Sequence, residues 1–260
     1  MGSAGPLVTQ MRTYGTMLVK VADKADRWRL QTLGVREFGW YPTSPFFGPV
    51  VGSNPYGMEA YKTIAYEIAE AFDWQPPDWC VLPVCYGDAL FGVWKGFEEL
   101  KALGWIERTP RLVAAEVSGS LAAAMEGGDA MPPEVARNAP SIATSIGAAQ
   151  ATVQALDVLR QSNGAAVTVS DDEMRRWVLT LAAKEGIWPE ASSAAPFAAI
   201  ERLRAEGTIK PNERCVALLT ASGMKDPGPI EKALPEPPLV TGGLKELLVA
   251  LKNAYGFSHG

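Results

Sequence analysis

The chain has 260 residues, of which 47% are hydrophobic and 20% are charged, so it is long enough to bury the core of one large domain or two small ones. Its net charge of -5, with basic residues scattered along the sequence, argues against nucleic acid or another polyanion as a partner. The single histidine, His259, argues against catalytic triads that need an imidazole base and against metal sites built on several histidines. We therefore predict no metal site.

The N-terminal segment is expected to fold as a helix, a strand and a second helix, at residues 7–14, 16–21 and 23–38. Residues 39–55 are then dense in proline, glycine and aromatic side chains, which is typical of a long irregular connection. We place a domain boundary in this connection, near Val51.

Strands and helices alternate through the rest of the chain. Asn54 and Pro55 are suited to the N-cap and first position of a helix, and Ser170 with Glu173 forms the pattern of a capping box. Strands are expected at residues 79–84, 112–117, 165–169 and 214–220, and helices at residues 89–101, between 132 and 161, at 171–184 and at 192–206. This alternation predicts an α/β fold with parallel sheets flanked by helices, in which chemistry lies in loops at the carboxyl ends of strands.

The cysteines and the hydropathy of the chain predict a cytoplasmic protein without membrane association. Cys80, Cys85 and Cys215 have no CxxC spacing and are too few for a disulfide framework, which is typical of a reducing compartment. No apolar run approaches the roughly 20 residues of a membrane-spanning helix, and the N-terminus lacks the apolar stretch of a signal peptide.

Two strand ends are candidate sites on their residues alone. In residues 83–90 a buried strand runs through a tight loop into a helix, where backbone N–H groups and the helix dipole could bind a phosphate. Any ordinary strand-to-helix turn would look the same, since the loop is neither a GxGxxG nor a Walker motif. Thr220 ends the last strand and could point its hydroxyl into a crevice, although small residues that merely cap the strand explain it equally.

Two further segments are less specific. Glu59 and Lys62 are three residues apart on a helix, which predicts a surface ion pair. Residues 186–195 read as a loop in which Ser192 or Ser193 caps the next helix.

Taken together and in this order, the motifs resemble the fold type II family of pyridoxal 5′-phosphate enzymes, within it the threonine synthase and threonine dehydratase group, with a likeness to the tryptophan synthase β subunit. The resemblance runs from about Gly5 to Ile230. The first three matching segments are a helix leading into a Tyr-Gly turn (7–15), an Asn-Pro helix start with Lys-Thr (54–63) and a phosphate loop (83–92). The other three are an Ala-Thr-x-Ile segment (141–146), a Pro-Glu-x-Ser-Ser loop (186–195) and a Lys-Asp-Pro ending (220–227).

The resemblance implies pyridoxal 5′-phosphate as cofactor and an elimination or replacement reaction on an amino acid, most like the conversion of O-phosphohomoserine to threonine and phosphate by threonine synthase. The cofactor would serve as electron sink, which agrees with the scarcity of histidine. The implied cofactor-binding residues are Gly87 and its neighbours Val84, Cys85, Tyr86, Asp88 and Ala89 at the phosphate, and Thr220 at the pyridine nitrogen. Glu190 and Ser193 would support the pocket, and Asn54 and Lys62 would lie on the substrate side.

The chain also departs from the family. The family's Schiff-base lysine lies in a Ser-Phe-Lys-Asp type motif upstream of the matched segments, and none of the eleven lysines of this chain has that context. We therefore identify no catalytic residue and expect an N-terminally incomplete enzyme of the two-domain architecture. Residues 1–50 would be the remnant of the smaller domain, 51–235 the cofactor-binding domain, and 236–260 a helical tail whose leucines dock on the body or on a second subunit of a homo-oligomer.

Three substitutions leave alternatives open. Cys85 and Asp88 stand where the phosphate loop usually has glycines, and a carboxylate about 4 Å from a phosphate costs roughly 1–4 kcal/mol per charge pair. Gly57 stands where threonine synthases usually carry an arginine near the substrate phosphate. The first alternative is therefore a serine or threonine ammonia-lyase, and the second is a non-catalytic truncated paralogue or a subunit that depends on a partner.

Overall fold

The computed structural model describes residues 5–22, 26–43, 54–136 and 139–258. The chain divides into two compact units, Met1–Asp226 and Pro227–Gly260. The expected boundary near Val51, the first residues of the expected helix 23–38, and His259 lie outside the described residues. No helix among the described ranges is long and apolar enough to cross a membrane.

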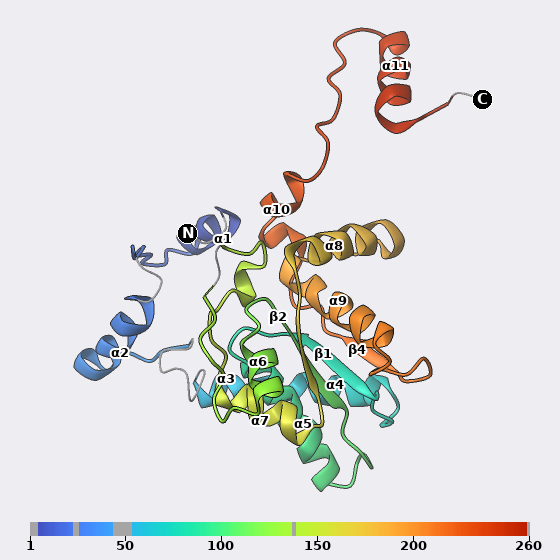
Figure 1. The fold of residues 1–260 in the computed structure, drawn as a ribbon. Helices are drawn as coiled ribbons and strands as arrows, with labels where there is room; N and C mark the ends of the chain where they lie inside the picture. Colours follow the sequence, from blue (N-terminus) through green and yellow to red (C-terminus); the bar gives the residue numbers. More distant parts are fainter. Residues whose placement is uncertain (1–4, 23–25, 44–53, 137–138, 259–260) are drawn as a thin grey trace. The chain divides into compact units, whose positions relative to one another are not determined.

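A four-stranded parallel sheet forms the centre of the first unit, as the sequence predicted (Figure 1). Its strands are β1 (Trp79–Pro83), β2 (Arg111–Glu116), β3 (Ala165–Thr168) and β4 (Cys215–Ala217), in the order β3-β2-β1-β4. Trp79 lies opposite Arg111 on one side and Cys215 on the other, so β1 is paired along both edges. A strand in this position is buried on both faces, which explains its continuous apolar sequence.

Alternate residues of β1 enter two separate cores. Cys80 and Leu82 pack in a cluster with α4 (Lys62–Ala71), α5 (Asp88–Ala102), α6 (Ser120–Gly127) and α7 (Val153–Gln161). Trp79 and Val81 pack in a second cluster with α8 (Asp171–Glu185) and α9 (Ala191–Ala205). Figure 1 shows the two sets of helices on opposite faces of the sheet. Successive side chains of a strand point to opposite faces of the sheet, which explains why β1 contributes to a core on each face.

The helix α5 approaches its neighbours closely through two glycines. A Cβ atom on Gly92 would lie 2.5 Å from the carbonyl oxygen of Met58 in α3 (Pro55–Ala60). A Cβ atom on Gly96 would lie 2.8 Å from the Cβ of Ala65 in α4. Both distances are shorter than any van der Waals contact between carbon and its neighbours, so side chains at these positions would push α5 away from the two helices.

Both predicted helix starts are confirmed. The Asn54 side chain accepts a hydrogen bond from the N–H of Tyr56 at 2.9 Å, with Pro55 as the first residue of α3. Ser170 and Glu173 form the reciprocal bonds of a capping box at the start of α8. These local patterns determine helix starts because they satisfy N–H groups that have no partner inside the helix.

The N-terminal prediction is right for the helices and wrong for the strand. The helices are α1 (Gly5–Thr13) and α2 (Asp26–Phe38). Residues 16–21 form no strand, and the side chains of Met17 and Val19 are 97% and 82% exposed. No described strand pairs with this segment, and an unpaired strand leaves its backbone polar groups without a ladder.

Three other segments differ from the predictions. Between residues 132 and 161 the described chain holds one helix, α7, and a single 3₁₀ turn, η1 (Thr144–Ile146), because prolines and glycines interrupt the segment. The helix α6 was not predicted; its alanine-rich sequence has no side-chain cap to mark its start. The strand β4 covers only Cys215–Ala217 of the predicted 214–220.

The second unit holds the short helix α10 (Gly228–Glu231) and the amphipathic helix α11 (Leu244–Tyr255). The apolar side chains Leu244 and Leu247 of α11 are 70% and 41% exposed.

Candidate functional site

A cavity of about 440 Å³ opens at the carboxyl ends of β1 and β4. Its size is within the range of small-molecule and cofactor sites. The β1–α5 loop, the turn η1, the loop before α9 and the segment after β4 contribute its wall. The lining residues are Arg27, Tyr61, Pro83, Val84, Cys85, Tyr86, Gly87, Asp88, Ala89, Leu90, Thr144, Ser145, Ile146, Glu190, Ser192, Thr220, Ala221 and Lys225.

Gly87 shapes the β1–α5 loop. Its φ of 104° lies in the region that side-chain-bearing residues rarely adopt, and a Cβ atom here would lie 2.3 Å from the Cβ of Ala155 in α7. The start of the same helix also holds the loop, because the hydroxyl of Thr152, the N-cap residue of α7, donates to the carbonyl oxygen of Tyr86 at 2.7 Å. A glycine is therefore required both by the backbone conformation and by the approach of α7.

The start of α5 faces the cavity without a side-chain cap. The first intrahelical hydrogen bond runs from the N–H of Phe91 to the carbonyl oxygen of Gly87 at 2.8 Å, and residues 87–90 line the cavity. In a 15-residue helix, such a start attracts anions through its N–H groups and the helix dipole. Asp88 opposes this attraction, because it places a carboxylate in the first turn.

Thr220, which lines the cavity, forms a hydroxyl pair with Ser193. The buried Ser193 oxygen accepts hydrogen bonds from the N–H groups of Thr220 at 3.1 Å and Ala221 at 3.0 Å, and it lies 2.8 Å from the Thr220 hydroxyl oxygen. Because a hydroxyl oxygen has two acceptor sites, both of which these N–H groups use, Ser193 must donate its proton to Thr220. The proton of the Thr220 hydroxyl then remains for an acceptor in the cavity.

The expectation that Ser192 or Ser193 caps a helix is wrong. The helix α9 begins at Ala191, and Glu190 occupies its N-cap position. Ser193 is the third residue of the helix and is fully buried, and its hydroxyl binds the backbone that follows β4. The sequence pattern could not distinguish these roles, since serine is suited to both.

Replacing Ser193 by alanine is expected to lower the free energy of unfolding by about 1–3 kcal/mol, because two N–H groups lose their acceptor. Thr220→Val is the matched comparison: it removes the cavity-facing hydroxyl but leaves both N–H bonds to Ser193 in place. Urea unfolding should therefore separate the variants. Equal stability of Ser193→Ala and the wild type would contradict the assigned hydrogen bonds.

Glu190, Lys225 and Ser145 form a polar cluster that also lines the cavity. The Lys225 ammonium lies 2.9 Å from Oε2 of Glu190, and it donates to Oε1 at 3.1 Å and to the Ser145 hydroxyl oxygen at 2.9 Å. Ser145 in turn donates to Oε2 of Glu190 at 3.3 Å. The Glu190 side chain is 6% exposed, so its charge needs the lysine as counter-ion.

The helix α2 contacts the cavity loop through Tyr86. The rings of Trp28 and Tyr86 lie 5.0 Å apart, and Arg27 lines the cavity. Burial raises the pKa of Tyr86 to about 12, although its hydrogen bond with Arg27 acts in the opposite direction. Tyr86 is therefore a neutral phenol that holds α2 against the loop at neutral pH.

Two predicted substrate-side residues are not brought to the cavity. The Asn54 amide caps α3 and donates to the carbonyl oxygen of Pro42 at 3.2 Å. Lys62 pairs with Glu59 and with Glu99 of α5, and the hydrogen bonds to these carboxylates, Glu59 first, raise its pKa. Lys62 thus joins α4 to α5, and the ion pair with Glu59 predicted from the spacing of three is present.

The cavity also includes residues that sequence reasoning did not assign to it, notably Ser145, Lys225 and Arg27. Ser145 and Lys225 lie inside segments that resemble the family, but neither has a motif of its own. One signal was available, because both are polar residues close to the ends of secondary-structure elements. Lys225 follows the strand predicted at 214–220, and Ser145 lies in a turn before α7. Arg27 gave no signal, since it is far from these segments in sequence.

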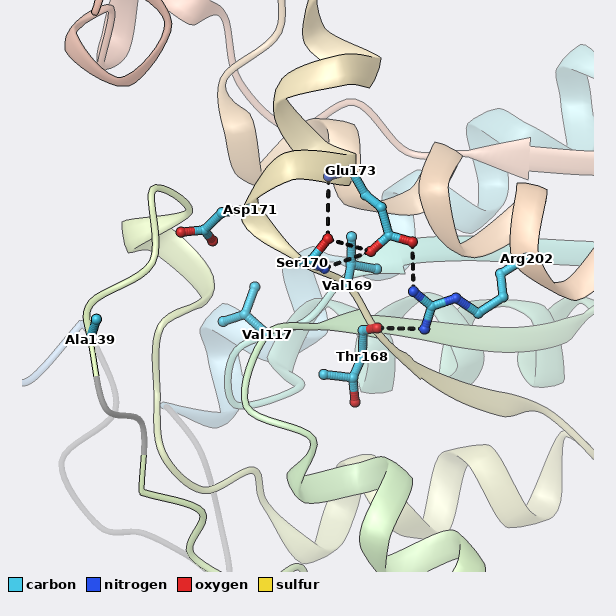
Figure 2. A pocket seen from close by; sticks show the side chains of 8 residues that line it. All are labelled: Val117, Ala139, Thr168, Val169, Ser170, Asp171, Glu173 and Arg202. Carbon is cyan, nitrogen blue, oxygen red and sulfur yellow. Dashed lines mark hydrogen bonds and ion pairs between the residues drawn. The ribbon is translucent and has the colours of Figure 1, made fainter. Parts of the chain in front are cut away.

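A second hollow, of about 460 Å³, lies at the carboxyl ends of β2 and β3 (Figure 2). Arg202 crosses it and donates to the carbonyl oxygen of Thr168 at 2.8 Å and to Glu173 at 2.6 Å. Figure 2 shows Glu173 also bound to Ser170 in the capping box. These charged groups neutralise one another and anchor α8 to α9, so the hollow is explained by packing and the first cavity remains the candidate site.

Residues 3–221 match the model of a family described as "Pyridoxal-phosphate dependent enzyme". The chain belongs to this family. It is 35% identical over 190 residues to threonine synthase of Methanocaldococcus jannaschii, covering 71% of this chain and 46% of the relative. It is 33% identical over 201 residues to threonine synthase of Methanosarcina acetivorans, covering 76% of this chain and 50% of the relative. The chain thus spans about half the length of the curated relatives it matches.

Solved structures confirm the fold. A fungal L-serine ammonia-lyase from Rhizomucor miehei superimposes with a TM-score of 0.67 at 18% identity, covering 89% of this chain and 70% of the other. Maize serine racemase gives a TM-score of 0.66 at 18% identity, covering 88% and 67%. The fold is therefore that of the fold type II pyridoxal-phosphate enzymes, as the motifs indicated, while identities this low carry no argument about the reaction.

Proposed function

We propose that the cavity binds pyridoxal 5′-phosphate and that the protein takes part in elimination or replacement on an amino acid, most like threonine synthase. Membership of the pyridoxal-phosphate family supports the cofactor, and threonine synthases at about 33% identity support the type of reaction. The structural observation that carries the proposal is that the uncapped start of α5 and the Thr220 hydroxyl line one cavity. They supply an anion site and a hydrogen-bond donor in the same cavity.

The residues of the cavity fit the cofactor in two respects. The α5 start at Gly87 and Ala89 would hold the phosphate through backbone N–H groups. The Thr220 hydroxyl, whose proton is directed outward by Ser193, would donate to the unprotonated pyridine nitrogen. When bound, the cofactor supplies an electron sink for the α-carbon of the amino acid. The chain's own residues bind and orient, and a neutral donor at the ring nitrogen suits elimination and replacement.

The proposal does not assign the lysine that forms a Schiff base with the cofactor in this family. Among the residues that line the cavity, the single lysine is Lys225, and it is held by Glu190 and Ser145. A lysine that is an ion-paired ammonium is a poor nucleophile, because the amine must lose its proton before it attacks. We therefore assign to this chain the binding of the cofactor, and assign the covalent step to no lysine of the cavity lining.

Pyridoxamine 5′-phosphate tests the cofactor site without any covalent step, since it has the ring and phosphate but no aldehyde. We expect saturable binding at one site per chain, measured by the cofactor's fluorescence and by equilibrium dialysis. Thr220→Val should weaken it while the fold is retained. Absence of binding at millimolar ligand would reject the cofactor site.

The reaction is tested on the protein loaded with pyridoxal 5′-phosphate. Phosphate release from O-phosphohomoserine is expected, and the alternative, ammonia-lyase activity, would give keto acid from serine or threonine. The alternative is retained because Gly57 has open space around it and no arginine extends from this position. Product from only the unphosphorylated amino acids would reject the threonine synthase proposal. Failure of both reactions, together with no borohydride-reducible lysine adduct, would favour the non-catalytic alternative.

The cysteines provide an independent prediction. Burial raises the pKa of Cys80 to about 12, so this thiol should react with a disulfide reagent only on unfolding. Cys85 lines the cavity, and its labelling at pH 8 should slow when pyridoxamine 5′-phosphate is added. Cys215, outside the cavity lining, is the internal control. Peptide mass spectrometry identifies each site, and equal protection of Cys85 and Cys215 would contradict the placement of the cofactor.

A further inference from the structure

Lys225 places a positive charge at the cavity. Its ammonium group donates to Oε1 of Glu190 and to the Ser145 hydroxyl, and it also lies 2.9 Å from Oε2 of Glu190. Ser145 directs its own proton to Oε2. The contacts of Lys225 within the cluster are thus to two side chains, Glu190 and Ser145.

The position of Lys225 makes its ammonium group accessible to a ligand. Its side chain is 31% exposed, whereas the Glu190 side chain is 6% exposed. Since Lys225 also lines the cavity, a ligand meets the ammonium more readily than the carboxylate behind it. The other cationic residue of the lining, Arg27, is engaged with Tyr86. Lys225 is therefore the cation of the lining that is not engaged with the β1–α5 loop.

The backbone around Lys225 is fixed by two loops that pair with each other. Pro189 and Ser222 form an isolated β-bridge, and the N–H of Glu190 donates to the carbonyl oxygen of Ala221 at 3.0 Å. The N–H of Gly223 donates to the carbonyl oxygen of Trp188 at 2.8 Å. The backbone thus joins these two loops independently of the ion pair, and Lys225 follows directly on the joined segment. The ion pair lies in the lining of the cavity, where a ligand would contact it.

We propose that Lys225 is a specificity-determining residue that binds an anionic oxygen group of the amino-acid substrate, with Glu190 and Ser145 as positioning residues. The inference rests on the proposed function. The group is either the α-carboxylate or a phosphoryl group on the substrate side chain, and the same charge-assisted hydrogen bond serves both. Lys225 remains an ammonium throughout and forms no covalent bond.

Reduced adducts of pyridoxal 5′-phosphate test this assignment without any reacting lysine, because each is a stable secondary amine. The adduct with ethylamine carries no substrate anion, the adduct with L-alanine carries the α-carboxylate, and the adduct with O-phospho-L-homoserine carries both groups. Calorimetric titration of the wild type with the three adducts shows which anion adds affinity. If neither anion adds affinity, the proposal is overturned.

The variants then show whether Lys225 is responsible. Lys225→Met should weaken the anionic adduct at least tenfold and leave the ethylamine adduct within twofold, whereas Lys225→Arg should retain most of the affinity. Glu190→Gln should keep or strengthen binding of the anionic adduct, because Lys225 loses its neutralising partner. Lys101→Met, on the exposed end of α5, is the matched control and should match the wild type. Thermal unfolding confirms that each variant is folded.

Two results would overturn the proposal. Lys225→Met could weaken all three adducts equally, which is the signature of a lysine that only supports the cavity wall. It could also leave every affinity unchanged. Failure of the wild type to bind even the ethylamine adduct would instead reject the cofactor site itself, and this inference with it.

Discussion

Gly87→Ala is expected to abolish binding of pyridoxamine 5′-phosphate and to lower the free energy of unfolding by about 2–5 kcal/mol. Two causes add. The φ of 104° is unfavourable for any residue with a Cβ atom, and that atom would lie 2.3 Å from the Cβ of Ala155. Relief of either strain moves the loop, and with it the start of α5. Urea unfolding and fluorescence titration measure the two effects.

Two control variants separate these causes. Gly104 also has a positive φ, of 74°, but a Cβ atom there would meet nothing within 4 Å. Gly104→Ala should therefore show only the conformational cost, about 1–2 kcal/mol, with cofactor binding unchanged. The double variant Gly87→Ala, Ala155→Gly removes the steric overlap and should recover part of the stability. If Gly87→Ala costs no more than Gly104→Ala, the approach of α7 does not constrain the loop.

Asp88→Asn should act in the opposite direction and increase affinity for pyridoxamine 5′-phosphate by about 10- to 100-fold. The substitution keeps the shape of the first residue of α5 and removes a negative charge from the proposed phosphate site. The neighbouring residues 87 and 88 would thus have opposite effects, one through shape and the other through charge. Equilibrium dialysis at low salt gives the largest difference, because added salt screens the repulsion.

Asp172→Asn is the matched control for Asp88→Asn. Asp172 also lies in the first turn of a 15-residue helix, α8, and its side chain is 93% exposed and paired with Arg175. Its replacement should change stability by less than about 1 kcal/mol and leave cofactor affinity unchanged. Unchanged affinity of Asp88→Asn would show that the Asp88 carboxylate points away from the bound phosphate.

The fold was predictable where local sequence patterns and long-range packing agree. The strand β1 has an apolar sequence because it is central, and Asn54 and Ser170 start helices by satisfying N–H groups within a few residues. The strand predicted at 16–21 shows the limit, since alternation alone does not supply a neighbour to pair with. The helix α6 was missed for the converse reason, because packing stabilises it without a local signal.

The candidate site was predictable in part for a similar reason. Gly87 and Thr220 were found because residues at the carboxyl ends of parallel strands meet at one edge of a sheet, and because their order resembles that of a known family. Ser145 and Lys225 reach the same cavity from separate turns, and their contact with Glu190 depends on the packing of those turns. Lys62 matches a family motif, but its side chain lies between helices and not in the cavity. The spacing of residues in the sequence is the same in both cases, so it could not distinguish them.

The paired glycines of α5 define where this protein can be redesigned. Gly92 and Gly96 set the depth at which the helix seats against α3 and α4, and the start of the same helix forms the wall of the cavity. A library that varies Asp88, Cys85 or Lys225 to change the ligand therefore samples side chains on a fixed scaffold. A library that also varies the two glycines would shift the scaffold itself, so its ligand preferences could no longer be traced to individual substitutions.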